Sequence, residues 1–163
     1  MSPGLRKLTL TAHVTTSVGW LGAAIAYLAL AVTALRTSDV AQARASLSVL
    51  ETVAWFAILP LCLAASTTGL LQALATEWGL IRHHWIIAKS VLTAIGTAIL
   101  LGHMPAIDRM SSVAASGGSV DAVGHGPTQL VVHATGGVIM LVALATISVF
   151  KPWGKTRFAR RGD

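Results

Sequence analysis

Four long apolar segments occupy most of this chain and restrict what it can fold into. About 20 helical residues cross a hydrocarbon core that is roughly 30 Å thick. The apolar segments cover residues 8–35, 47–75, 84–103 and 128–150, so each is long enough to cross. A backbone inside lipid has to satisfy its own hydrogen bonds, which favours helices. The sequence therefore predicts an all-α integral membrane protein, an up-and-down bundle of four transmembrane helices.

The composition favours a membrane location for the whole chain. Of its 163 residues, 54% are hydrophobic and 11% are charged, whereas charged residues make up about a quarter of a typical soluble domain. Residues 1–163 are therefore predicted to form one transmembrane domain, with a mobile loop at 104–127 and a basic tail at 151–163. The first segment is far longer than the core of a secretory signal, so we expect it to be retained as an anchor.

The positive charges divide unevenly between the two sides of the predicted bundle. If the N-terminus is cytoplasmic, nine of the twelve Lys and Arg residues fall on the cytoplasmic side. This positive-inside pattern predicts that both termini are cytoplasmic in a plasma membrane. Topology and anionic lipid headgroups explain the basic tail, so no nucleic-acid partner is expected. The expected partners are the lipid bilayer and, within it, other membrane proteins or further copies of the chain.

Most of the histidines lie near the ends of the apolar segments, where a polar ring is costly unless something binds it. The helical repeat gathers the ionisable side chains into one cluster at each membrane face. The inner cluster contains His13, His83 or His84, and Lys89. The outer cluster contains Glu51, His103 and His133, and Glu51 is the only carboxylate within an apolar segment. Histidines at segment ends also occur as interfacial residues, as expected for His83 and His84.

The two clusters predict sites for b-type haem, which needs imidazoles from facing helices and small residues beside the flat macrocycle. We expect His13 to pair with His84, and His103 to pair with His133. Lys89 is then expected near a propionate or a counter-ion. By the helical rise, the two histidines of each pair differ in depth by roughly 7 Å, so pairing needs tilted helices. The predicted function is haem binding for electron transfer.

Two other functions remain open. Glu51, His103 and His133 are also suitable ligands for copper or another metal, in a binding or transport protein. Alternatively, the histidines are interfacial and the chain is a structural or accessory subunit of a membrane complex. The sequence shows no nucleophile beside a base, no phosphate loop and no paired acids, so we do not expect a conventional hydrolase or transferase.

Three stretches of the chain carry a resemblance to known proteins: TAHVTTSVGWLGAAIAYLAL (11–30), TTGLLQAL (67–74) and WIIAKSVLTAIGTAILLGHM (85–104). They resemble small four-helix bacterial membrane proteins. More distantly, they are similar to the membrane domain of the copper-resistance protein D family, which is related in architecture to haem-binding cytochrome b proteins. The resemblance covers residues 11–104, including His13, Gly69 and Lys89. It implies a bacterial plasma membrane, and a link to haem or copper if His13 and the outer histidines are ligands.

Overall fold

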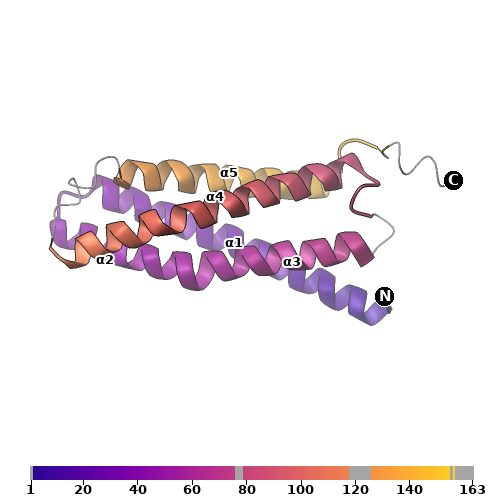
Figure 1. Ribbon diagram of the computed structural model, residues 1–163, viewed down its shortest axis with the longest axis horizontal. Helices are drawn as coiled ribbons and strands as arrows, with labels where there is room; N and C mark the ends of the chain where they lie inside the picture. Colours follow the sequence, from indigo (N-terminus) through magenta and orange to yellow (C-terminus); the bar gives the residue numbers. More distant parts are fainter. Residues whose placement is uncertain (1, 76–78, 118–125, 155, 157–163) are drawn as a thin grey trace.

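The computed structural model describes residues 2–75, 79–117, 126–154 and 156, and its regular elements in this part of the chain are all helices. They are α1 (Pro3–Arg36), α2 (Val40–Val53), the short π-helix η1 (Ala54–Ile58), α3 (Leu59–Ala75), α4 (His84–Ala115) and α5 (Gly126–Phe150). Figure 1 shows them running side by side along one long axis. Four helical units are long and apolar enough to cross a membrane: α1, the continuous unit Val40–Ala75, α4 and α5. The protein is therefore an all-α membrane protein, as predicted.

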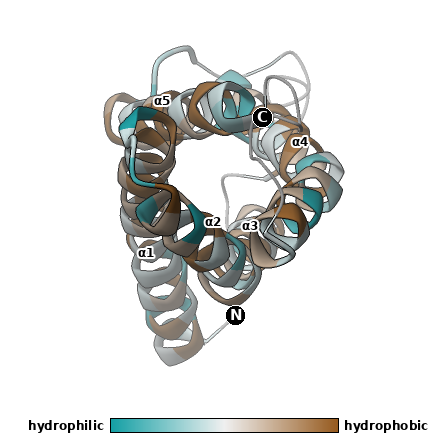
Figure 2. Ribbon diagram, turned by 90° about the vertical axis from the view of Figure 1, so that its left-hand side faces the viewer, coloured by the Kyte–Doolittle hydropathy of each residue, from teal (hydrophilic) through white to brown (hydrophobic). Residues whose placement is uncertain are grey.

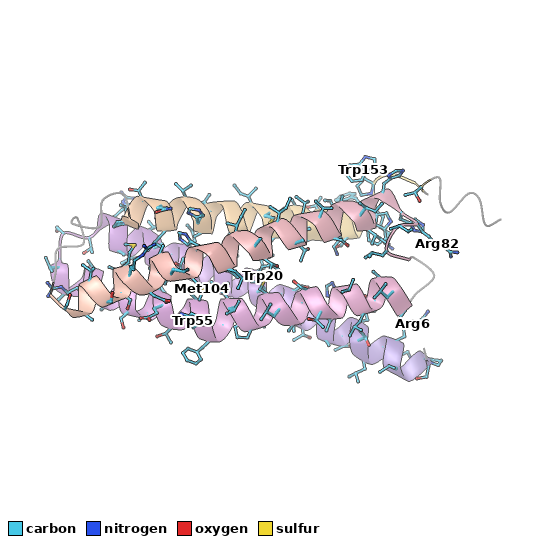
Figure 3. All side chains as sticks on the ribbon, viewed as in Figure 1. Arg6, Trp20, Trp55, Arg82, Met104 and Trp153 are labelled. Atoms are coloured by element: carbon cyan, nitrogen blue, oxygen red, sulfur yellow. The ribbon has the colours of Figure 1, made fainter. Side chains whose placement is uncertain are left out.

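The chain enters and leaves the bundle at the same end, because it crosses four times. The start of α1 and the end of α5 both lie toward the right-hand end of the bundle in Figure 1, and we call this the His13 end. The opposite end, where α1 turns into α2, is called the Glu51 end. Arg6, Arg82 and Trp153 all lie at the His13 end (Figure 3).

The turn between the first two spans is shorter than predicted, because α2 begins at Val40 and not near residue 47. The carboxylate of Asp39 accepts a hydrogen bond from the backbone N–H of Ala41 at 2.9 Å. A side-chain oxygen in this position satisfies a backbone donor that the first turn of a helix leaves free. Asp39 therefore starts the second span directly after the first has ended.

A wide helical turn interrupts the second span. In η1 the N–H of Leu59 donates to the carbonyl of Ala54, five residues back, where an α-helix would use the fourth. Pro60 follows at once; it has no N–H, and its ring would crowd the preceding turn of an ordinary α-helix. The wide turn leaves Ala54 and Ile58 buried inside the bundle.

The fourth element differs most from the prediction. The expected loop at 104–127 is wrong over residues 104–115 and 126–127, because α4 continues through Pro105 to Ala115 and α5 begins at Gly126. This extension has a buried stripe at spacings of three and four residues, and α2 packs against α4. The stripe consists of Met104, Ile107, Met110 and Ala114. Residues 118–125 of the predicted loop, and most of the predicted basic tail, lie outside the described residues.

Helices α4 and α5 pack antiparallel in a regular register. Three successive contacts lie seven residues apart on each helix, and in two of them a glycine faces a methionine. Gly96 lies against the end of Met140, and Gly126 against Met110. Between them, the rings of His103 and His133 are in contact. A glycine opposite a long side chain lets two helices approach closely.

The view along the bundle places the helices around a common axis, with hydrophobic residues on every one of them (Figure 2). Helix α1 contributes a buried stripe to the interior: Trp20, Ala24, Tyr27, Ala31 and Ala34. Trp20 on α1 and Met104 on α4, both labelled in Figure 3, are buried in the bundle.

Candidate functional site

A cavity of about 380 Å³ lies inside the bundle, between α1, η1, α4 and α5. Its wall is almost entirely aliphatic and aromatic. None of the described residues that line it is charged when His103 and His133 are neutral. The polar nitrogen and oxygen atoms of its side chains come from Trp20, Tyr27, His103 and His133. An apolar pocket with a few polar groups is the usual form of a small-molecule site.

His103 and His133 form a stacked pair in the wall of this cavity. Their ring centroids are 4.0 Å apart and their planes differ by 24°. The Nδ1 of His133 lies 2.8 Å from the carbonyl oxygen of Gln129. A carbonyl only accepts hydrogen bonds, so this nitrogen carries the proton of the neutral ring. The Nε2 of His133 is then left with a lone pair for a ligand.

Two buried polar atoms of the cavity residues have no hydrogen-bond partner among the described residues. They are the hydroxyl of Tyr27 and the Nε2 of His103. Tyr27 is only 5% exposed, so its hydroxyl is removed from bulk solvent. Leaving such a group unsatisfied costs about 1–3 kcal/mol, and buried polar groups in proteins nearly always have partners. Both atoms therefore indicate a site for a bound molecule.

Three exposed residues of the lining indicate that the cavity opens toward the outside of the bundle between α4 and α5. Ile99 and Val132 both line it, yet they are 53% and 63% exposed. Gly136, also in the lining, is exposed and has no side chain to close the gap. These apolar residues belong to spans that face lipid, so the opening connects the cavity with the hydrocarbon layer.

The predicted outer cluster is only partly assembled. The carboxylate of Glu51 accepts a hydrogen bond from the hydroxyl of Ser111 on α4. Ser111 lies eight residues beyond His103, which is about 12 Å along the helix. The part of the chain that the structure describes has no group of three His, Cys, Asp or Glu side chains able to hold a metal. The structure brings His103 and His133 together without Glu51.

The predicted inner cluster is only partly assembled: Lys89 lies within electrostatic range of His13, while each of the two has its own hydrogen-bond partner. His13 faces α3, where its Nδ1 lies 3.1 Å from the carbonyl of Ala65 and 3.2 Å from the hydroxyl of Thr68. His84 is the first residue of α4 and is exposed. His13 therefore finds its hydrogen-bond partners on α3, and the bonds described for it do not involve His84.

Lys89 connects α4 to α5 at the His13 end. Its ammonium group donates to the hydroxyl of Ser148 at 2.5 Å, and that hydroxyl donates to the carbonyl of Leu144 at 2.8 Å. Lys89 is half-buried. In the described structure this lysine thus has a hydroxyl as its acceptor and lies outside the cavity lining.

Tyr27 is the site residue that the sequence analysis missed. It is the only tyrosine of the chain. It also continues the helical stripe of Trp20 and Ala24, four and then three residues apart. The sequence feature that points to Tyr27 is a single tyrosine on the same face of a predicted transmembrane helix as Trp20.

Comparison of the chain with protein-family models, with curated proteins and with solved structures gave no match.

Proposed function

We propose that this membrane protein binds a lipophilic redox-active molecule in the cavity and carries electrons within the membrane. The observation that supports this most is the pair of unpartnered polar atoms, the Tyr27 hydroxyl and the His103 Nε2, at an apolar cavity in the described structure. The apolar wall suits a lipophilic ring, and the polar atoms would fix its orientation. Imidazoles are common ligands of redox cofactors, which favours a redox role.

The haem b predicted from the sequence is one molecule of this kind, and the chemistry of the donor atoms fits it. His133 has the tautomer that leaves Nε2 free, and the Nε2 of His103 has no partner among the described residues. Gly136 and Gly137 in the lining leave space beside His133. Either histidine would hold the iron, which, when bound, accepts and returns one electron.

The stacked rings restrict how such a haem would be held. Two axial imidazoles lie on opposite sides of an iron, so their rings are separated by the macrocycle. Rings with centroids 4.0 Å apart leave no space for an iron between them. A haem at this site would therefore have only one protein ligand. A second haem held by His13 and His84, with Lys89 near a propionate, stays a prediction from the sequence.

An absorption spectrum tests the haem assignment. The protein is produced with added haem, purified in detergent and measured oxidised and reduced, together with His133→Ala, His103→Ala and His84→Ala. A Soret band that is lost in the first or second variant and kept in His84→Ala would support the cavity site. Loss in His84→Ala alone would support the inner pair. No Soret band in the wild-type protein would exclude haem, although not another redox molecule.

We also propose that the protein lies in a bacterial plasma membrane with the His13 end in the cytoplasm. Arg6 and Arg82 lie at this end, in agreement with the positive-inside rule (Figure 3). Fusions of the C-terminus to green fluorescent protein and to alkaline phosphatase test the orientation. The first is expected to fluoresce and the second to be inactive. The reverse result would contradict the proposed orientation.

A further inference from the structure

From the cavity we infer that its ligand is a lipid-soluble quinone, and that the Tyr27 hydroxyl donates a hydrogen bond to one of its carbonyl oxygens. This inference rests on the proposed function, since it names the chemical class of the lipophilic redox molecule. It concerns binding alone, and three observations support a quinone over haem.

The first observation is the hydroxyl of Tyr27. Its side chain is 95% buried, it lines the cavity, and its O–H has no acceptor among the described residues. A phenol donates readily to a carbonyl oxygen. A ring that bears carbonyl oxygens, and is otherwise apolar, would supply the missing acceptor without bringing a charge into the cavity.

The second observation is the nature and size of the cavity. Its volume of about 380 Å³ is near the lower end of the range of about 300–1,000 Å³ for small-molecule sites. A single substituted ring fits this volume better than a four-pyrrole macrocycle does. Among the described residues, the lining contains no lysine or arginine. The carboxylates of a haem would therefore be buried there without a positive partner, which is costly.

The third observation is the opening between α4 and α5. Ile99 and Val132 line the cavity and are also exposed on the lipid-facing surface. A lipid-soluble quinone carries a long apolar tail on its ring. With the ring in the cavity, the tail can leave between these two side chains and remain in the hydrocarbon layer.

Trp20 provides a direct measurement of binding, because it is buried in the wall of the same cavity. Quinones quench tryptophan fluorescence at short range. The purified full-length protein in detergent is titrated with decyl-ubiquinone. Saturable quenching is expected, and it is expected to disappear in Trp20→Phe, since the other described tryptophans do not line the cavity.

The role of Tyr27 is tested with Tyr27→Phe, which removes only the hydroxyl. Loss of one neutral hydrogen bond is expected to raise the Kd about three- to tenfold. Phe56→Leu is the matched control, because Phe56 is 82% exposed and lies outside the cavity lining; its Kd is expected to be unchanged. An unchanged Kd in Tyr27→Phe would contradict the assigned hydrogen bond.

A second variant keeps the inference testable if Tyr27→Phe does not fold. An added Cβ at Gly136 meets no atom within 4 Å, and Gly136→Leu would place a side chain in the opening. It is expected to abolish saturable quenching. Absence of saturable quenching in a wild-type protein that shows a Soret band would overturn the quinone and leave the proposed function intact. Absence of both signals would overturn the two together.

Discussion

The imidazole of His13 on α1 lies directly against Gly69 on α3. A Cβ added to Gly69 would come within 2.9 Å of the His13 Cε1. The same ring is held through Nδ1 by the Ala65 carbonyl and the Thr68 hydroxyl. The contact between α1 and α3 at the His13 end thus depends on a residue without a side chain.

Gly69→Ala is expected to displace the His13 ring and weaken both hydrogen bonds. We expect the free energy of unfolding to fall by about 1–3 kcal/mol, the cost of leaving a buried polar group unsatisfied. Thermal unfolding in detergent measures this. Gly22→Ala is the control, because an added Cβ there meets no atom within 4 Å. Equal stability of the two variants would show that the contact between His13 and α3 does not contribute to the free energy of unfolding.

Ser111→Ala is expected to destabilise the Glu51 end by about 1–3 kcal/mol, because it removes the hydroxyl that donates to the Glu51 carboxylate. Ser112 is a matched control on the next position. It is exposed, and in the described structure its hydroxyl donates within its own helix, to the Arg109 carbonyl at 2.8 Å. Ser112→Ala should therefore unfold at nearly the wild-type temperature. A similar loss in both variants would assign the effect to α4 itself and not to Glu51.

Replacing Ser148 is expected to lower the free energy of unfolding more than replacing Lys89 does. Ser148→Ala leaves a half-buried ammonium group without its described acceptor, so we expect a loss of about 1–3 kcal/mol. Lys89→Met removes the charge together with the cost of burying it, so we expect a smaller loss than in Ser148→Ala. Urea unfolding of the two variants compares them. A larger loss in Lys89→Met would show that the charge itself stabilises the fold.

Tyr27→Phe is expected to stabilise the ligand-free protein by about 1–3 kcal/mol, because it removes a buried hydroxyl that has no partner in the described structure. The measurement is thermal unfolding of protein from which lipophilic molecules have been extracted. A lower unfolding temperature in Tyr27→Phe would mean that the hydroxyl already has a partner, such as an ordered water.

The spans could be predicted from the sequence because about 20 apolar residues in lipid have few alternatives to a helix. The extension of α4 was missed because Pro105 and the glycines beyond it indicate a loop. In the structure Pro105 gives up one backbone hydrogen bond, and the buried stripe around it packs against α2. In the sequence, the residues of that stripe have helical spacing, but polar residues, a proline and glycines surround them, so the spacing alone does not predict a buried helix.

The site could be predicted only in part. The sequence assigns His103 and His133 to the same membrane face, although the helical rise places them roughly 7 Å apart in depth, and the structure stacks their rings. Depth alone does not give the rotation of a helix about its axis, which turns His13 toward α3 and aligns Glu51 with Ser111. Tyr27 could not be predicted in this way, because a tyrosine hydroxyl acts as a neutral donor and does not ionise near neutral pH.

The most direct test of the account is whether a redox-active molecule is purified with the protein. The wild-type chain and His103→Phe, which keeps a ring of similar shape, are extracted from membranes in mild detergent. Each is measured as an oxidised-minus-reduced spectrum and then extracted with organic solvent. We predict a redox-active molecule at about one per wild-type chain and much less in His103→Phe. A folded wild-type protein with no such molecule, or equal amounts in both proteins, would contradict the central claim.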